Sequence, residues 1–230
     1  VLTSGDEIQS PEDSPLPGKI FDSNGPQLMQ LLQQSGFVNV QREHLPDDPG
    51  IIRNTLTRVL TDSAQRPDVI ISTGGVSVGE EDHLRAVLAE HGELDFWRLA
   101  IKPGKPFTYG RIDDIPFFGL PGNPSAVLVC YLMLVLPTLR RSCGADAVLP
   151  TAMPLPVDFA INKPAKRQEY LRVRCVSESG QLTLQKHPNQ SSGMLSSAVW
   201  ADGLTVVPVG STVSPGDTLS FFSFSALLAG

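Results

Sequence analysis

Apolar residues in the first part of the chain alternate between short continuous runs and helical spacings. The run Asp68–Ser72 is mostly apolar, which is typical of a parallel strand buried on both faces. The spacing of Leu84, Val87 and Leu88 then predicts an amphipathic helix, which we expect to end at Gly92. Because strands and helices alternate in this way up to about residue 145, the sequence predicts an α/β domain with three αβα layers around a mostly parallel sheet.

The remaining elements of this domain follow from the same patterns. We expect strands at Val1–Thr3, Phe37–Val40, Phe96–Ile101, Phe107–Tyr109 and Ile115–Gly119. Helices are predicted after residues 22–24, after the turn at residues 46–49, and over the apolar stretch Ser125–Arg140. The apolar part of that stretch is shorter than the roughly 20 residues of a membrane span, so we interpret it as a buried helix.

Beyond residue 145 the pattern changes to alternating segments separated by Gly, Ser, Pro and Asn turns. These segments are Gln168–Val176, Gln181–Gln185, Leu204–Val207 and Asp217–Phe222. Alternation with a period of two is typical of strands with one buried face, and it predicts a small all-β, barrel-like domain. The sequence therefore predicts two domains, an α/β domain at residues 1–145 and a C-terminal β domain at residues 146–230.

Composition and charge narrow the function classes. The net charge is −6 over 230 residues, and no broad basic surface is expected, so we expect neither nucleic-acid nor membrane binding. The cysteines Cys130, Cys143 and Cys175 form no metal-binding pattern and suit a reducing, cytoplasmic location. Because the chain begins at Val1 without a methionine, we interpret it as a piece of a longer protein.

A glycine-rich loop over residues 73–79 follows the strand at Asp68–Ser72. Its three glycines let the backbone approach an anion, and the helix after it adds the positive end of a dipole. The acids Glu80, Glu81 and Asp82 start that helix. They either favour the helix N-terminus or include a Mg²⁺ ligand. A tightly packed turn and a hydrolase nucleophile elbow at Ser77 are the alternatives. The elbow is disfavoured because the only distant downstream histidine, His187, falls in the predicted β domain and no HGGG-type oxyanion loop is visible.

Two further loops carry groups suited to an anion. Residues 102–106 read Lys-Pro-Gly-Lys-Pro, which holds two ammonium groups on a stiff frame suited to an oxyanion such as phosphate. Residues 119–124 read Gly-Leu-Pro-Gly-Asn-Pro and open the predicted buried helix, whose first N–H groups form another anion site. The alternatives are a solvated turn for the first loop and a simple strand-to-helix turn for the second.

These loops, taken in order, resemble those of the molybdopterin molybdenumtransferases, the family that includes bacterial MoeA and the E domain of gephyrin. The matching strings are TSGDE at 3–7, DSN at 22–24, STGGVSVG at 72–79, KPGKP at 102–106, GLPGNP at 119–124, GMLSS at 193–197 and ADGL at 201–204. The resemblance covers nearly the whole chain. It implies insertion of molybdate into adenylylated molybdopterin, with Mg²⁺-dependent cleavage of the adenylate and release of AMP.

The resemblance also implies roles for particular residues. Asp82, Lys102 and Lys105 would be catalytic, with Asp82 as the Mg²⁺ ligand. The residues implied to bind the pterin nucleotide are Gly5, Asp6, Glu7, Asp22, Asn24, Thr73, Gly74, Gly75, Val76, Ser77, Gly79, Pro103, Gly104, Pro121, Gly122, Asn123, Pro124 and Ser125. Ser125 is followed by alanine, whereas the family commonly has Val-Ser at these two positions, so the role of its hydroxyl is open.

The resemblance implies further partners. The full-length protein would be a homodimer with two more N-terminal domains, and a molybdopterin adenylyltransferase would act upstream of it. We expect this chain to bind the pterin nucleotide but to turn over poorly. Two alternatives stay open: the adenylyltransferase itself, which has the α/β fold without the lysine loop and appended β domain, and a non-catalytic scaffold.

Overall fold

A computed structural model describes residues 1–64, 66–75, 83–178 and 180–229. The chain divides into two compact units. Residues 1–99 and 106–122 form the first unit, and residues 100–105 and 123–230 form the second. The lysine loop and the helix after residue 123 therefore group with the C-terminal strands, and the predicted domain boundary at residue 145 stays a prediction.

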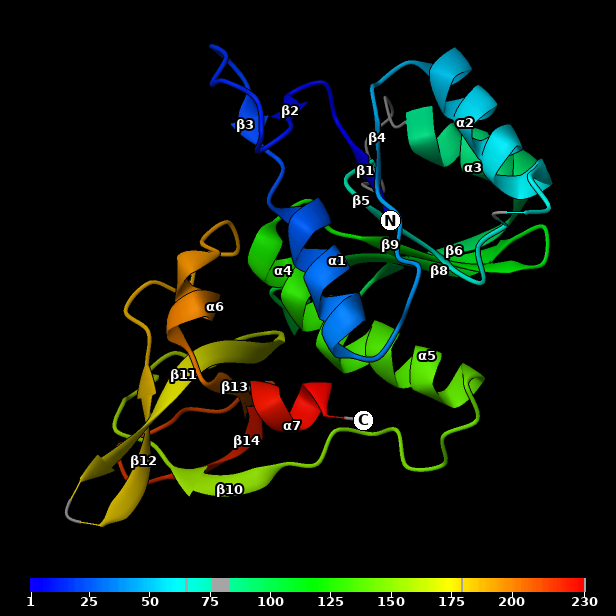
Figure 1. Ribbon diagram of the computed structural model, residues 1–230. Coiled ribbons are helices and arrows are strands. Elements are labelled where there is room, and N and C mark those ends of the chain that lie inside the picture. The colour runs from blue at the N-terminus through cyan, green and yellow to red at the C-terminus, as the bar shows by residue number, and fades with distance from the viewer. Residues whose placement is uncertain (65, 76–82, 179, 230) are drawn as a thin grey trace. The chain divides into compact units, whose positions relative to one another are not determined.

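The first unit is built on a six-stranded sheet that is mostly parallel (Figure 1). Its strands, in order across the sheet, are β4 (Glu43–Leu45), β1 (Leu2–Ser4), β5 (Ile70–Thr73), β9 (Ile115–Leu120), β8 (Pro106–Ile112) and β6 (Gly92–Arg98). The first four strands run parallel, and β8 and β6 pair antiparallel at the other edge. Because β1, β5 and β9 run parallel, their carboxyl ends lie at the same end of the strands. Open α/β sheets bind ligands beyond these carboxyl ends.

Helices cover both faces of this sheet. On one face, Leu2, Ile70 and Phe117 form a core with the buried residues of α2 (Pro49–Thr61) and α3 (His83–His91). Neighbouring residues of a strand face opposite sides, so Thr3 faces away from that core. It meets α1 (Asn24–Gln34), since a Cβ on Gly25 would lie 3.1 Å from the Thr3 methyl group. The predicted three-layer αβα fold is confirmed.

Short polar side chains determine where helices α1 and α2 begin. Asp48 caps α2 by accepting a hydrogen bond from the Ile51 N–H at 2.9 Å, and Pro49 occupies the first turn. The helix predicted after residues 22–24 is confirmed, and its cap comes from Asp22. The Asp22 carboxylate accepts from the Gly25 N–H at 2.8 Å.

One predicted strand is absent, and another is divided into two strands. Residues 37–40 are not a strand, and Val38 is 81% exposed. The chain instead pairs with β1 at β4, where Leu45 is fully buried. Two or three apolar residues do not make a strand unless a neighbouring edge and the core receive them. The strand expected at Phe96–Ile101 is two strands in separate sheets, β6 and β7 (Ile101–Lys102).

The buried helix predicted at Ser125–Arg140 runs from Pro124 to Ser142. It consists of α4 (Pro124–Cys130), a π-helical turn (Tyr131–Val135) and α5 (Leu136–Ser142). Pro137 has no N–H to donate within the helix, which accounts for a wider turn just before it. By length and composition this helix is the one candidate membrane span among the described residues, but 67% of the apolar window is buried inside the protein, as in a core helix.

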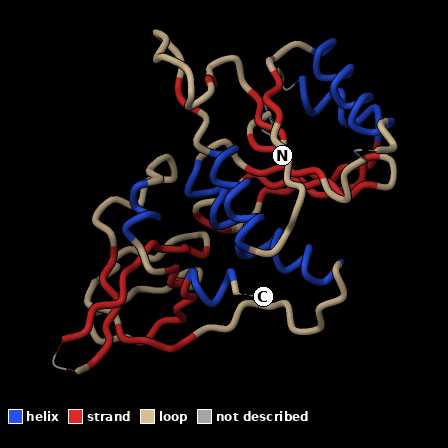
Figure 2. Tube along the Cα trace, viewed as in Figure 1, coloured by secondary structure: helices blue, strands red, loops and turns tan. Residues whose placement is uncertain are grey.

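The second unit holds the predicted β barrel (Figure 2). The strands, in order, are β10 (Met153–Pro156), β14 (Thr218–Ser223), β13 (Gly203–Val207), β11 (Gln168–Glu178) and β12 (Gln181–Lys186), and β7 adds to β11. A bridge from Val157 to Leu184 joins the two ends of this order. The alternating pattern predicted four of these strands. It missed β10, whose two prolines are tolerated at its place on the sheet edge.

Three short features were not anticipated by the sequence pattern. They are the small parallel ribbon of β2 (Ile8–Gln9) and β3 (Ile20–Phe21) and the helices α6 (Ser196–Trp200) and α7 (Phe224–Leu228). The first helix is held by Arg172, whose side chain is fully buried. The Arg172 Nε donates to Ser197 Oγ at 3.0 Å and an Nη donates to the Ser191 carbonyl at 3.0 Å. Burial lowers the pKa of Arg172 to about 10, so the side chain remains charged at neutral pH.

Ser197→Ala is expected to lower the free energy of unfolding by about 2 kcal/mol. The change removes the acceptor of a buried, charged N–H, and leaving such a donor unpaired is costly. Chemical denaturation of both proteins measures the difference. The neighbouring Ser196 is exposed, so Ser196→Ala serves as a control and should change stability by less than about 0.5 kcal/mol. Equal effects of the two changes would contradict this account of Arg172.

Candidate anion and nucleotide site

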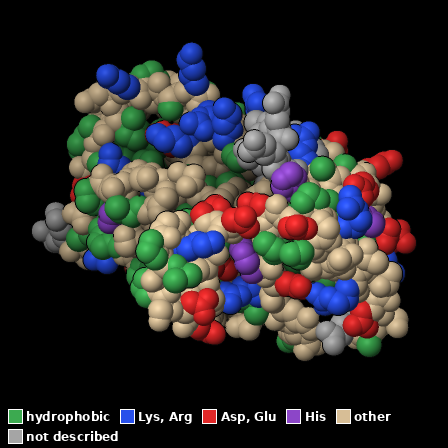
Figure 3. Space-filling view, turned by 90° about the horizontal axis from the view of Figure 1, so that it is seen from above, with side chains coloured by type: hydrophobic (Ala, Val, Ile, Leu, Met, Phe, Trp, Pro, Cys, Tyr) green, Lys and Arg blue, Asp and Glu red, His purple; other side chains and the backbone are tan. Residues whose placement is uncertain are grey.

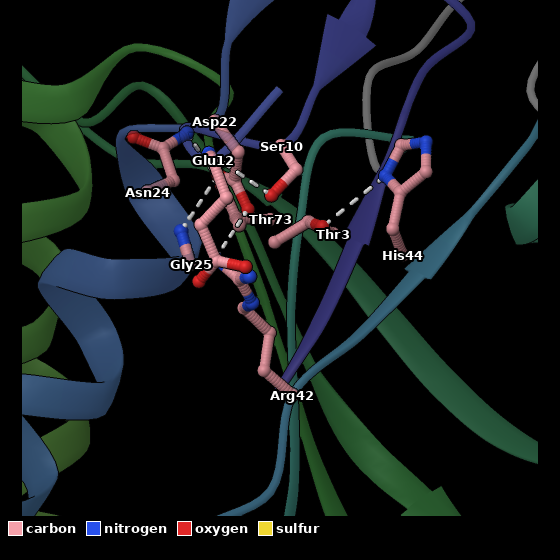
Figure 4. Close-up of polar contacts among 9 residues, drawn as sticks. All are labelled: Thr3, Ser10, Glu12, Asp22, Asn24, Gly25, Arg42, His44 and Thr73. Atoms are coloured by element: carbon pink, nitrogen blue, oxygen red, sulfur yellow. Dashed lines mark hydrogen bonds and ion pairs between the residues drawn. The ribbon is translucent and has the colours of Figure 1, made fainter.

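In the first unit, three loops at the carboxyl edge of the sheet are joined by two side chains. The Asn24 amide donates to Thr73 Oγ1 at 2.9 Å (Figure 4). It also donates to the Gly122 carbonyl at 2.7 Å. Thr73 in turn donates to the Pro121 carbonyl at 2.9 Å. The start of α1 is thereby fixed to the ends of β5 and β9, and the predicted site residues of these segments lie together.

The glycine turn after β5 packs directly on Ser4 at the end of β1. A Cβ on Gly74 would lie 2.7 Å from the Ser4 carbonyl oxygen, and one on Gly75 would lie 2.6 Å from Ser4 Oγ. Ser4 is 6% exposed, and its hydroxyl has no hydrogen-bond partner among the described residues. A buried hydroxyl without a partner loses about 1–3 kcal/mol relative to a paired one. Ser4, which was not among the predicted site residues, thus places a buried hydroxyl directly beside this turn.

Gly74→Ala tests how tightly this turn packs. Gly74 has φ +80°, and Gly18, in open space, has φ +78°, so alanine strains the backbone equally at both positions, by about 1–2 kcal/mol. Contact with the Ser4 backbone should cost Gly74→Ala about 1–3 kcal/mol more. Thermal unfolding of the two variants compares them. A Gly18→Ala variant as unstable as Gly74→Ala would show that space around the turn is not limiting.

The predicted acidic positions take up different roles. Both carboxylate oxygens of Asp22 have partners within the chain, since one caps α1 and the other lies 3.4 Å from Arg42 (Figure 4). The backbones and carboxylates of Asp6 and Asp47 are bonded reciprocally, at 2.9 and 3.1 Å. Glu7 folds over Gly5, where a Cβ would lie 2.6 Å from its carboxylate. The sequence patterns gave no reason to single out Asp47, which orients Asp6.

Four predicted site residues lie outside the described residues. They are Val76, Ser77, Gly79 and Asp82. Among the residues that the structure does describe, no group of three His, Cys, Asp or Glu side chains is placed to hold a metal ion.

In the second unit, the lysine loop is fixed to the edge of β11. Strand β7 pairs parallel with β11, which places Lys102 opposite Glu169. The Lys102 Nζ donates to Glu169 Oε1 at 2.7 Å. Lys105 is exposed, whereas Pro103 and Gly104 between the lysines are buried. The Lys102–Pro103 peptide bond is cis.

The lysine loop packs on the side chain of Cys130. A Cβ on Gly104 would lie 2.8 Å from the Cys130 sulfur, and the cysteine is fully buried, as predicted. Burial raises the pKa of its thiol to about 12, so Cys130 is protonated at neutral pH and acts as a core residue. The loop thus packs on Cys130 at Gly104, and the Glu169 carboxylate fixes Lys102.

The start of α4 is tied to the loop before α6. Ser125 is fully buried, its N–H donates to the Ser192 carbonyl at 2.9 Å, and its hydroxyl donates to the Met194 carbonyl at 3.0 Å. The Asn123 carbonyl accepts from the first turn of α4, its side chain makes no cap bond, and Pro124 occupies the first helical position. The Ser125 hydroxyl therefore has a structural partner, while Asn123 is exposed.

Charge is mixed on the surface drawn in Figure 3. Both Lys or Arg and Asp or Glu side chains occur on this face. This face is therefore not uniformly basic. Backbone N–H groups at a glycine turn suit phosphate, and paired ammonium groups suit a small oxyanion. The fold is that of an α/β protein whose loops carry groups suited to phosphorylated or oxyanionic ligands.

Comparison with known families makes this class specific. A family model described as a probable molybdopterin binding domain matches residues 1–141, more than half of the chain. The chain belongs to this family of molybdopterin-binding proteins. A second model, described as the MoeA C-terminal region (domain IV), matches residues 154–224. The two matches in this order are those of the MoeA family, as the loop strings predicted.

Individual relatives agree with this assignment. A molybdopterin molybdenumtransferase of Haemophilus influenzae is 31% identical over 231 residues, covering 99% of this chain and 56% of that protein. The molybdenum cofactor synthesis protein cinnamon of Drosophila melanogaster is 34% identical over 220 residues, covering 94% of this chain and 35% of its own length. A MoeA crystal structure from Pyrococcus horikosii matches the whole chain and 54% of its own, with a TM-score of 0.75 and 24% identity, which shows the shared fold. The chain spans between about a third and somewhat over half of these relatives.

Proposed function

We propose that this chain is the pterin-binding and C-terminal part of a molybdopterin molybdenumtransferase. The reaction would insert molybdate into adenylylated molybdopterin and release AMP. The observation that carries the proposal is the similarity to an enzyme of that name over 99% of this chain. The match of residues 154–224 to a MoeA C-terminal region favours this reaction over that of an adenylyltransferase, which would not need the appended β domain.

The two units supply different groups to this reaction. The glycine turn, Ser4 and the loop fixed by Asn24 and Thr73 would bind the phosphates and pterin of the substrate through backbone N–H groups and hydroxyls. Lys102 and Lys105 would bind molybdate, which is a substrate, through charge-assisted hydrogen bonds. The remaining predicted site residues would line the path of the pterin nucleotide by virtue of their places in the same loops.

The proposed Mg²⁺ rests on Asp82, which lies outside the described residues. The described carboxylates do not make a site without it, because no three of them gather with metal-ligand geometry. Bound beside Asp82, Mg²⁺ would neutralise charge on the phosphates as the adenylate is cleaved. Lys102 and Lys105, the other proposed catalytic residues, would hold molybdate in place for the transfer.

Further properties are proposed from the family alone. The complete protein would be a cytoplasmic homodimer that receives its substrate from a molybdopterin adenylyltransferase. The proposed domain boundary remains near residue 145, between the two matched family regions. Because the chain spans about half of the Haemophilus relative, it would bind the pterin nucleotide but turn over slowly by itself.

A chimera tests the proposed activity. In it, this chain replaces the matching segment of the Haemophilus influenzae molybdenumtransferase, and AMP release from adenylylated molybdopterin is followed by liquid chromatography. We expect molybdate-dependent AMP release well above that of this chain alone. A chimera that folds by circular dichroism and binds the nucleotide, yet releases no AMP when molybdate is added, would contradict the proposal.

A further inference from the structure

Glu169 is a buried carboxylate that contacts one of the two proposed oxyanion-binding lysines. The residue is 9% exposed, and its Oε1 lies 2.7 Å from the Lys102 Nζ. The lysine side chain is 53% exposed, so its ammonium group faces solvent while its partner is fixed in the protein. An ammonium group has three N–H donors, and this contact leaves two of them for an incoming anion.

The position of Glu169 is set by the strand pairing of the second unit. Lys102 and Glu169 are directly opposite in the β7–β11 pair. Two hydrogen bonds just before these residues reinforce the pairing, since the Gln168 N–H donates to the Ala100 carbonyl at 2.9 Å and an Arg167 Nη donates to the Ile101 carbonyl at 3.3 Å. The carboxylate is thus held beside the loop by the backbone and does not depend on a flexible segment.

We propose that Glu169 sets the affinity and the charge selectivity of the lysine loop for oxyanions, an inference that rests on the proposed function. Its negative charge offsets one of the two positive charges of Lys102 and Lys105, so the loop attracts an anion less strongly than two free lysines would. It also holds the Lys102 ammonium group in one orientation. A dianion experiences twice the repulsion from Glu169 that a monoanion of the same shape does.

A low affinity for the free oxyanion suits a transfer reaction. Molybdate must leave the lysine loop for the dithiolene, and tight binding of the free oxyanion would stabilise the ground state without lowering the barrier. Glu169 therefore acts on the reaction through Lys102. It is a positioning and selectivity-determining residue and makes no contact with the reacting atoms in this proposal.

The test is calorimetric titration of this chain with molybdate, a tetrahedral dianion, and with perrhenate, a tetrahedral monoanion. Glu169→Gln keeps an acceptor for Lys102 but removes the charge. It should bind molybdate about three- to tenfold more tightly and perrhenate about two- to threefold more tightly than the wild type. In a Lys102→Gln background the same change should have a clearly smaller effect on both affinities, because only the direct repulsion between Glu169 and the anion then remains.

Glu90→Gln is the matched control. Glu90 also accepts from a cation at 2.7 Å, Arg53, in an exposed ion pair on the other unit, so its removal changes the net charge equally and should leave both affinities unchanged. Unchanged or weaker molybdate binding by Glu169→Gln, equal gains for the two anions, or a gain as large without Lys102 as with it would overturn the inference alone. Absence of molybdate binding by the wild type would overturn it together with the oxyanion step of the proposed function.

Discussion

Lys102→Gln is expected to lower molybdate-dependent AMP release by the chimera about 100-fold. The change removes a fixed positive charge from the loop proposed to bind the oxyanion, and loss of one preorganised donor to an oxyanion typically costs a factor of about 100–1,000. The glutamine amide can still donate to Glu169, so little stability should be lost. Initial rates at saturating pterin nucleotide, measured over a range of molybdate concentrations, give the effect on both kcat and KM.

Lys163→Gln is the control for this change. Lys163 is an exposed lysine of the same unit, and its replacement lowers the net charge by the same amount. We expect its rate to stay within about twofold of the unaltered chimera, as for most surface substitutions. A Lys102→Gln chimera that retains more than half of the original rate would remove the lysine loop from the reaction, whatever the pterin site does.

Gly92→Ala is expected to prevent stable folding of the first unit. A Cβ at this position would lie 1.9 Å from the Arg111 carbonyl oxygen and 2.8 Å from the Ile112 Cα. Both atoms belong to the backbone of β8, so the clash is relieved only by separating β6 from β8 and losing hydrogen bonds of the ladder. The expected loss is more than about 4 kcal/mol, a large share of the roughly 5–15 kcal/mol that stabilises a typical domain.

Soluble yield and denaturant unfolding measure this effect. Gly193→Ala is the control, because the nearest atom to its Cβ would be 3.8 Å away, and it should unfold as the wild type does. A Gly92→Ala protein with wild-type stability would mean that β6 and β8 are not paired as described at this end.

Gly92 also shows where sequence patterns reach their limit. Its place after the helical spacing of Leu84 and Leu88 predicted a helix cap, and α3 does end at His91. The glycine instead begins β6, with no positive φ, and is required by the approach of β8. The spacing of apolar residues locates the end of a helix. It does not reveal that a strand distant in the sequence packs closely against the residue that follows.

The fold class was predictable because each element carries its own local pattern. The strands β5 and β9 are continuous apolar runs, and the strands of the barrel alternate, so both sheets could be expected from the sequence. Short strands such as β4 and β10 depend on pairing with β1 and β14. Their own residues give little signal, and the sequence placed a strand wrongly at residues 37–40.

The candidate site was predictable in its loops and not in its internal contacts. The glycine turn and the lysine loop were evident from their residue types. Glu169 lies 67 positions after Lys102, and only the pairing of β7 with β11 brings the two together. Ser4 stands within a recognised string, yet its relevance comes from the buried, unpaired state of its hydroxyl among the described residues.

Calorimetric titration of this chain with adenylylated molybdopterin, with and without Mg²⁺, tests whether the glycine loop forms a pterin-nucleotide site. Asp82→Ala is measured beside it, with Asp13→Ala, a change in an exposed loop, as the control. We expect binding that is strengthened by Mg²⁺ in the wild type and in the control and is weakened in Asp82→Ala. Absence of binding, or binding that responds neither to Mg²⁺ nor to the loss of Asp82, would contradict a pterin-nucleotide site on the glycine loop.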